Sequence, residues 1–157
     1  MRFKIPLLAT FLVSYAAHAG QNLAPRGGWA VINTDKDFQP LVKDTRTAVI
    51  AQGLIVLTQA DPTAAAKKRG ITIPGNRMIG AFNNDFAVRV LETFNAAMIE
   101  APIRLYVTEN SDGTATLYYK TPTTVFAPYI AEGGAPLVSI AAELDQIFQH
   151  ISKAVGA

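Results

Sequence analysis

The feature that most constrains the fold is a segment of alternating polar and apolar residues, interrupted once by residues typical of turns. The alternation runs from Ile103 to Glu109 and resumes from Thr114 to Thr121. Between the two runs stands Asn110-Ser111-Asp112-Gly113, whose residue types are common in turns. Two alternating runs joined by so short a turn predict a β-hairpin. Because an isolated hairpin is marginally stable, the rest of the chain must supply further strands and a cover for its apolar face.

The register of this hairpin decides which side chains share a face. A four-residue turn places Leu105 opposite Tyr118 and Arg104 opposite Tyr119. The face that contains Leu105 is then expected to point to the core. Aromatic rings offer contact area and arginine offers directed hydrogen bonds, so the other face suits recognition unless a helix covers it and its tyrosines belong to the core. The residues predicted on this outward face are Arg104, Tyr106, Leu117 and Tyr119.

The segments around the hairpin predict further strands that alternate with helices. Asp37 and Asp61 can each cap a helix with a proline in its first turn, and Gly53 and Gly70 can end those helices. The resulting order, β-α-β-α-β-α-β-β-α, predicts a single α+β domain in which helices pack on one sheet. The further strands are expected over 29–33, 54–58 and 77–82, and the helices over 38–52, 62–69, 84–98 and 136–155.

The segment 121–135 connects the hairpin to the last helix. It contains Pro122, Pro128 and Gly133-Gly134, and the sequence predicts a long loop there. Loops of this length are usually functional, mobile or in contact with a partner. His150 lies off the apolar stripe of the last helix, so we expect it to be a solvated surface residue.

The N-terminus has the three parts of an export signal. Arg2 and Lys4 are basic, Ile5 to Ala17 is apolar, and Ala17-His18-Ala19 supplies the small residues that signal peptidase recognises. We expect cleavage after Ala19 and export to the periplasm or out of the cell. No convincing membrane span remains after cleavage, since spanning takes about 20 apolar residues. The predicted organisation is a signal peptide over 1–19, an N-terminal segment with the first strand over 20–35, and an α+β domain over 36–157.

The composition excludes several classes of chemistry. The chain contains no cysteine, which excludes disulfides, thiolate nucleophiles and zinc sites built on cysteine. Cleavage leaves His150 as the one histidine, and no cofactor is expected. Loss of Arg2 and Lys4 leaves as many acidic residues as basic ones. A neutral domain is a poor candidate for binding nucleic acid, which attracts clustered positive charge.

Several short motifs occur in a fixed order between about Lys36 and Pro122. Together they resemble the domain of unknown function 302 family, a group of small bacterial and archaeal α+β domains. The ordered succession is more specific than any one motif. The motifs that carry the resemblance are Gln52-Gly53-Leu54, Asp61, Ile79-Gly80-Ala81-Phe82-Asn83, Ala101-Pro102 and Val107-Thr108-Glu109.

The sequence departs from this family where many members carry cysteine. Phe82-Asn83-Asn84 stands in place of Cys-Asn-Pro, and Ala101-Pro102-Ile103 stands in place of Leu-Pro-Cys. If those cysteines bind a metal or do redox work in relatives, this chain cannot do the same. The resemblance implies a compact domain that can pair as a homodimer, and it implies no established reaction.

Several motif residues have structural explanations that compete with a role in binding. Asp61 and Asn83 stand where helix caps are expected, and Glu109 ends a strand beside a turn. Arg77, on the third strand, can add a second cation to an anion-binding surface. No catalytic or metal-ligating residue is predicted. The residues predicted to bind a ligand or partner are Arg77, Asn83, Arg104, Tyr106, Glu109 and Tyr119.

Three kinds of function remain open from the sequence. We favour an exported binding or accessory module that recognises a small molecule or an envelope protein through the 103–121 hairpin face and the 121–135 loop. The alternatives are an enzyme that uses carboxylate, arginine and tyrosine groups without metal or thiol, and a purely structural envelope protein. A concave pocket lined by Arg104, Tyr106 and Tyr119 favours ligand binding, converging carboxylates favour catalysis, and a flat apolar patch favours a protein partner.

Overall fold

One antiparallel sheet forms the frame of the molecule. The computed structural model describes residues 23–156, so the predicted signal peptide lies outside the described residues. The strand order is β1-β5-β4-β3-β2, which sets the β4–β5 hairpin between β1 and β3. This sheet and its helices confirm the predicted α+β class and element order. The strands are β1 (Trp29–Asp37), β2 (Ile55–Ala60), β3 (Asn76–Phe82), β4 (Ile103–Glu109) and β5 (Thr114–Lys120).

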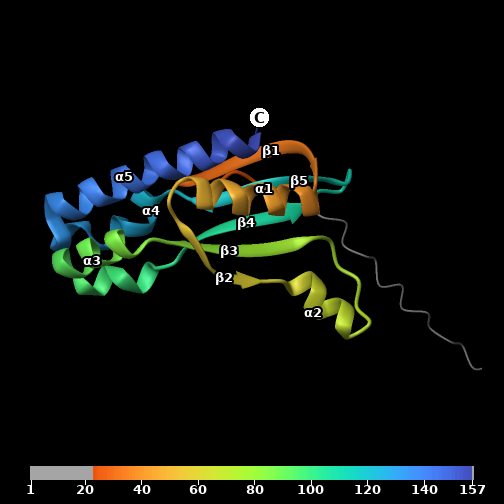
Figure 1. Cartoon of the computed structure of the whole chain (residues 1–157), viewed down its shortest axis with the longest axis horizontal. Helices are drawn as coiled ribbons and strands as arrows, with labels where there is room; N and C mark the ends of the chain where they lie inside the picture. Colours follow the sequence, from red (N-terminus) through yellow and green to blue (C-terminus); the bar gives the residue numbers. More distant parts are fainter. Residues whose placement is uncertain (1–22, 157) are drawn as a thin grey trace, which may run out of the picture.

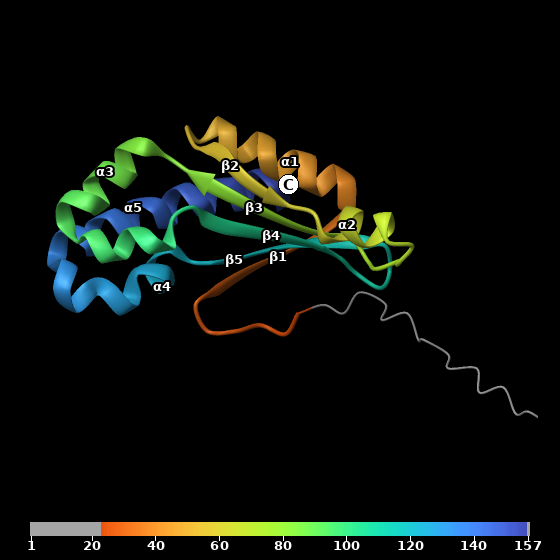
Figure 2. The ribbon, with the colours of Figure 1, turned by 90° about the horizontal axis from the view of Figure 1, so that it is seen from below.

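The two long helices, α1 and α5, lie across one face of the sheet, with α3 at one end of the molecule and α2 at the other (Figures 1 and 2). The third helix is shorter than expected, because the extended backbone of Phe94 ends it before the 3-10 segment η1. The helical segments are α1 (Phe38–Ala51), α2 (Pro62–Lys68), α3 (Asn84–Thr93), η1 (Asn95–Glu100), α4 (Pro122–Phe126), η2 (Ala127–Tyr129) and α5 (Ile130–Gly156).

Short polar residues fix where the helices begin. Asp61 Oδ1 accepts a hydrogen bond of 2.9 Å from the Ala64 amide, and Asn83 Oδ1 accepts one of 2.8 Å from the Asp85 amide. Asp37 also precedes its helix as predicted, but its side chain makes no capping hydrogen bond. Side-chain oxygens at these positions satisfy amide groups that have no partner within the first helical turn.

The core lies between the sheet and the two long helices. Ile79, Leu105 and Leu117, from the central strands, are fully buried. By length and composition the stretch Pro122–Gly156 is also apolar enough to cross a membrane, but in this fold its apolar stripe packs into the core. His150, off that stripe, is exposed as expected. The helical residues that pack on the sheet include Leu41, Val42, Val49, Leu137, Ile140, Leu144, Phe148 and Ile151.

The hairpin register differs by one residue from the prediction. Leu105 pairs with Tyr119 instead of Tyr118, and Glu109 pairs with Ala115, so the loop is one residue longer than expected. The physical reason lies in Asn110. Its amide donates to the Thr114 carbonyl at 2.8 Å, and its buried side chain donates to Thr114 Oγ1 and Thr116 Oγ1.

This register exchanges the faces of the β5 side chains. Leu117 and Tyr119, which were predicted to point outward, are buried on the helix-covered face, with exposed fractions of 0% and 5%. The phenol of Tyr119 hydrogen-bonds Ser152 of α5 at 3.0 Å, and its ring lies 5.2 Å from that of Phe148. Tyr118, which was predicted to point to the core, lies instead on the face opposite the helices, next to Tyr106.

The 121–135 segment is helical, which corrects the prediction of a long loop. Thr121 Oγ1 accepts a hydrogen bond from the Thr124 amide, so α4 begins directly after β5. Pro122 fits the first helical position, where no amide donor is needed. Gly134, with a φ of 58°, interrupts the helical backbone two residues before Pro136, where the last helix was predicted to open.

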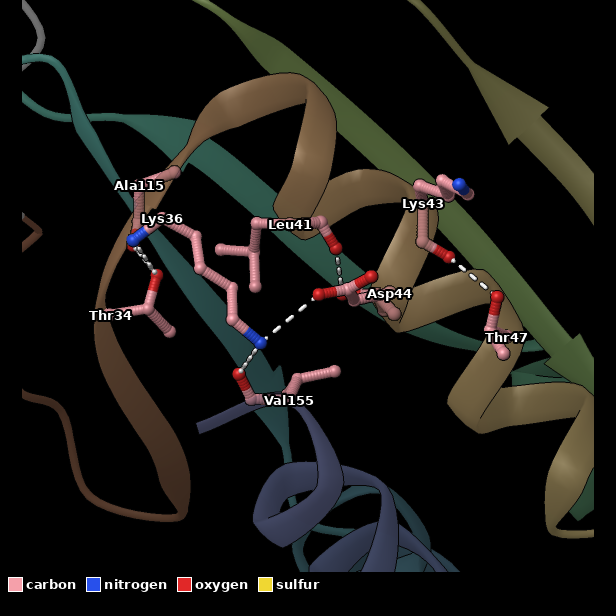
Figure 3. A network of polar contacts seen from close by, with 9 residues as sticks. Thr34, Lys36, Leu41, Lys43, Asp44, Thr47, Ala115 and Val155 are labelled. Atoms are coloured by element: carbon pink, nitrogen blue, oxygen red, sulfur yellow. Dashed lines mark hydrogen bonds and ion pairs between the residues drawn. The ribbon is translucent and has the colours of Figure 1, made fainter. Parts of the chain in front are cut away.

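The far end of β1 ties the two long helices together. The strand continues past Asn33, its predicted end, to Asp37. Lys36 Nζ lies 3.0 Å from Asp44 Oδ2 of α1 and donates a 2.9 Å hydrogen bond to the Val155 carbonyl of α5 (Figure 3). A cation suits the C-terminal end of a helix, where carbonyl groups lack partners.

Candidate functional site on the uncovered face of the sheet

The face of the sheet opposite α1 and α5 carries a row of large side chains across four strands. Tyr106 pairs with Tyr118 on β5 and with Met78 on β3, and Val31 of β1 pairs with Tyr118. The two tyrosine rings lie 6.3 Å apart at a tilt of 43°. Asn76 of β3 donates a hydrogen bond to the Tyr106 hydroxyl and so helps to fix the position of that ring. The row forms a rigid aromatic floor.

A second row, one step along the same face, is cationic. Arg104 pairs with Gly80, and Lys120 pairs with Trp29. The pairing of β4 with β5 ends at Leu105 and Tyr119, and Arg104 and Lys120 are the next residues along the two strands. Both cationic side chains are exposed, and within residues 23–156 neither makes an ion pair or a side-chain hydrogen bond.

Together the two rows border a groove of about 520 Å³. This volume lies in the range of small-molecule sites, which are mostly apolar with a few directed polar groups. We call it the open-face groove. Its side chains come from β1, β3, β4 and β5 and from the η1 and α4 segments. Its main lining residues are Trp29, Met78, Glu100, Arg104, Tyr106, Tyr118, Lys120, Thr124 and Val125.

Glu100 is the one carboxylate among the residues that line this groove. Its Oε1 accepts a 2.8 Å hydrogen bond from the Tyr129 hydroxyl. That bond raises the pKa of Tyr129, because the phenol donates to a carboxylate only while it keeps its proton. The carboxylate is therefore engaged with a neutral tyrosine and is not paired with either groove cation.

Gly80 explains part of the groove's shape. A Cβ atom at this position would collide with Thr58 Oγ1 and would lie 2.7 Å from Pro102 Cγ. Only glycine therefore allows Thr58 and Pro102 to close over β3 beside Arg104. This packing gives a structural reason for the glycine of the Ile79-Gly80-Ala81 motif.

The segment before β1 lies against the same face. The Leu23 amide donates a 3.2 Å hydrogen bond to the Tyr118 hydroxyl. The Arg26 guanidinium lies 5.5 Å from the centre of the Trp29 ring, within cation–π range. These contacts help to bury Tyr118, which is 1% exposed, as the floor of the groove.

The structure brings only part of the predicted site together. Arg104 and Tyr106 line the groove on the face where they were predicted. Tyr119 borders the groove, but its ring is in the core, where burial raises the pKa of its phenol.

The other predicted site residues have partners elsewhere. Arg77 lies on the helix-covered side of β3 and forms an ion pair with Asp61, so it is not the second cation of an anion site. Asn83 caps α3 and donates to the Gly53 carbonyl at 3.0 Å. Glu109 accepts a 2.6 Å hydrogen bond from the Gly75 amide and holds the loop before β3. These contacts give each of the three residues a structural role.

Sequence reasoning did not identify Trp29, Met78, Tyr118 or Lys120 as site residues. A five-residue loop at Asn110–Thr114 would have set Tyr118 and Lys120 on the face of Arg104. Nothing local reveals Trp29 and Met78, because they join the site only through the strand order of the sheet.

The remaining chemistry of the described residues is limited. Within residues 23–156 no group of three or more histidine, cysteine, aspartate or glutamate side chains could hold a metal ion. A second cavity, of about 40 Å³, lies among apolar core residues such as Ala97 and Phe126. This space is close to the volume of one water molecule, about 30 Å³. It is too small for a ligand.

The fold and the groove define a class: a small single-sheet α+β domain with helices on one face and an aromatic, cationic groove on the other. The chain belongs to the family described as domain of unknown function DUF302, whose model matches residues 30–155. The match includes all of β1 except Trp29, and almost all of α5, beyond the 36–122 stretch that carried the sequence resemblance.

A solved structure confirms this fold. The chain is similar to the crystal structure of an uncharacterized conserved DUF302 protein from Bacillus stearothermophilus, with a TM-score of 0.72 and 17% sequence identity. The similarity covers 82% of this chain and 98% of the other. A comparison with curated proteins finds no match.

Proposed function

We propose that this protein is a binding module that takes a small molecule into the open-face groove. The observation that carries the proposal is the groove itself, a concave space of about 520 Å³ with an aromatic floor and two cations that have no partner in the described chain. A flat apolar patch would instead favour a protein partner.

The distribution of carboxylates favours binding over catalysis. General acid–base chemistry needs groups that converge on a reacting atom in one cleft. Glu100 is the one carboxylate in the groove lining, whereas Asp61 and Glu109 are held by Arg77 and Gly75 at other places. The groove lining therefore lacks the pair of converging carboxylates that would favour an enzyme.

Export belongs to the same proposal and rests on the N-terminal sequence. Arg2, Lys4, the apolar run and Ala17-His18-Ala19 form the signal, and cleavage after Ala19 would free the mature chain in the periplasm or outside the cell. We expect a chain that lacks 1–19 to be soluble and folded by circular dichroism. Insolubility would count against a cleaved signal.

The groove is tested by native mass spectrometry of mature protein recovered from the periplasm. We expect a mass above that of the chain, because a molecule that fills the groove should survive gentle purification. The variant Met78→Trp fills the groove, since Met78 lies on its floor beside Tyr106. Val138→Trp is the matched control, because Val138 is a half-exposed residue of α5 that does not line the groove.

The control separates groove binding from adventitious binding. Retained mass should disappear in Met78→Trp and persist in Val138→Trp, with thermal unfolding showing that both variants fold. Retained mass that is equal in the two variants would contradict the groove as the binding site.

Pairing as a homodimer, which the family resemblance implies, stays a prediction. β2 forms an edge of the sheet, and its Ile55 and Leu57 side chains are 53% and 51% exposed. The strand contains no charged residue of the kind that usually keeps sheet edges apart. The same mass measurement reports whether one or two chains are present.

A further inference from the structure

The cationic row of the open-face groove is unusual in its electrostatics. Arg104 and Lys120 directly follow the last pair of β4 and β5, Leu105 with Tyr119, so they lie on adjacent strands, where neighbouring like charges destabilise a sheet. Both side chains are exposed, and no carboxylate of the described chain forms an ion pair with either of them. The free protein therefore holds two cations in the groove that form no ion pair within the described chain.

Three other cations of the described chain do form ion pairs, and these pairs connect elements of the fold. Lys36 pairs with Asp44 at 3.0 Å, and Arg77 pairs with Asp61. Arg89 makes two hydrogen bonds to the Glu143 carboxylate, at 2.7 and 2.8 Å, which raise its pKa and lower that of Glu143. Other exposed cations of the described chain, such as Lys153, also have no ion pair, but Arg104 and Lys120 are the two that line the groove. A molecule in the groove can therefore supply their counter-charge.

The chemistry of the two cations defines the head group that they fit. A guanidinium offers a planar set of donors that binds carboxylate, phosphate or sulfonate oxygens in pairs, and a lysine adds a mobile point charge. Glu100 adds one negative charge to the same lining, so two cations and one carboxylate leave the groove with a formal charge of +1. A ligand with one negative charge balances it.

The rest of the groove defines the body of the ligand. Tyr106 and Met78 form the accessible part of an apolar floor next to the cations, Tyr118 lies buried within that floor, and Trp29 ends the cationic row beside Lys120. Aromatic rings and a thioether favour flat or aliphatic groups that lie against them. The head group and the body are therefore recognised by adjacent rows of the same face.

We infer that the open-face groove is selective for amphipathic monoanions, small molecules with one acidic head group on an aromatic or aliphatic body, and that Arg104 and Lys120 hold the head group. The inference rests on the proposed binding function and names its ligand class. Carboxylates and sulfonates, which carry one negative charge at neutral pH, share this head-group chemistry.

Two fluorescent probes with the same aromatic body test it. Anilinonaphthalene sulfonate carries one negative charge, and N-phenylnaphthylamine is its uncharged counterpart. We expect the mature wild-type protein to bind the sulfonate at least about tenfold more tightly, because hydrogen bonds to charged groups contribute on this scale. Added salt should narrow the difference, since exposed charges are screened.

Substitutions then assign the selectivity to the two cations. Arg104→Gln combined with Lys120→Gln should abolish the preference for the sulfonate, because it should weaken binding of the sulfonate at least about tenfold more than binding of the uncharged probe. Arg104→Lys should keep part of the preference, because it keeps the charge and loses the planar donor set. Lys153→Gln is the matched control for charge, because Lys153 is an exposed lysine of α5 outside the groove.

The outcomes separate this inference from the proposed function. If both probes bind equally and Met78→Trp removes both, the groove binds ligands but the inferred charge selectivity is wrong. If neither probe responds to Met78→Trp, the groove is not the binding site and the proposed function fails. A preference for the sulfonate that survives the double glutamine variant overturns the assignment to Arg104 and Lys120.

Discussion

The two faces of the β4–β5 hairpin come from the same two strands and differ in how completely their side chains are partnered. On the helix-covered face, Leu105 and Leu117 are fully buried, and Tyr119 finds Ser152 of α5 for its hydroxyl. On the open face, Arg104 and Lys120 are exposed and have no partner within the described chain. The difference separates residues that stabilise the fold from residues that are free to bind a ligand.

Lysines show the same contrast. Lys36 at the end of β1 contacts both Asp44 of α1 and the last turn of α5 (Figure 3). Lys120, on the neighbouring strand, has Trp29 and Arg104 beside it and no carboxylate partner. An ion pair between partly exposed groups contributes at most about 1 kcal/mol. The presence or absence of an ion pair therefore changes the stability of the fold little and mainly decides whether the lysine is available to a ligand.

The largest expected effect comes from truncating the covered face. Leu117→Ala should lower the free energy of unfolding by about 3 kcal/mol, because it removes buried methyl groups and leaves a cavity. Met78→Ala on the open face should cost less than about 1 kcal/mol, since Met78 is already 38% exposed. Urea unfolding of both variants measures the difference. Equal losses would show that the open face also belongs to the core.

The second expected effect concerns the hydroxyl of the covered tyrosine. Tyr119→Phe removes the hydrogen bond to Ser152 and should cost about 1 kcal/mol. Burial, the larger cause, and the negative charge of Asp145 raise the pKa of Tyr119, although the bond to Ser152 opposes this rise. The folded protein therefore keeps this proton at a pH at which the unfolded chain has lost it.

The sign of the pH dependence follows from that difference. The contribution of Tyr119 is fully present below the ordinary tyrosine pKa of about 10 and is lost as the pH rises above it towards the raised value. Phenolate absorbance of wild type minus Tyr119→Phe should thus appear later in an alkaline titration than for a free tyrosine. Phenolate absorbance that appears at the same pH as for a free tyrosine would instead indicate that the Tyr119 phenol is exposed to solvent.

The elements of this fold could be predicted from local signals, whereas the hairpin register could not. Asp61-Pro62 and Asn83-Asn84 mark helix starts, and alternation marks both hairpin strands. Consecutive tyrosines at 118 and 119 make the two registers look alike, because a slip of one residue exchanges one ring for the other. The choice is made by the Asn110 side chain, which reaches Thr114 and Thr116 across the loop.

The candidate site could likewise be predicted only where it depends on one strand, and not where it depends on the hairpin register or the strand order. Arg104 and Tyr106 share a face in either register, because they lie two residues apart on one strand. Lys120 depends on the register, and Trp29 and Met78 depend on β1 and β3 lying on the two sides of the hairpin. Arg77 does not join the groove because it pairs with Val107 and so lies on the covered face, where the β2–α2–β3 connection brings Asp61 to it.

The smallest expected effect has the opposite sign to the others. Lys120→Gln should raise the free energy of unfolding of the ligand-free protein by about 0.2–0.5 kcal/mol at low salt, because it relieves the repulsion from Arg104. The gain should shrink at high salt, where exposed charges are screened. Lys153→Gln, which removes the same charge from a surface position, should change stability little.

This small gain is informative because it links stability to binding. A residue that costs stability in the free protein is one whose favourable contacts come from a ligand, as at other functional sites. Lys120→Gln should therefore stabilise the free protein while weakening binding of anilinonaphthalene sulfonate. Thermal unfolding with and without the probe measures both effects in one experiment. A loss of stability in the free variant would mean that Lys120 has a structural partner, and the open face would then resemble the covered one.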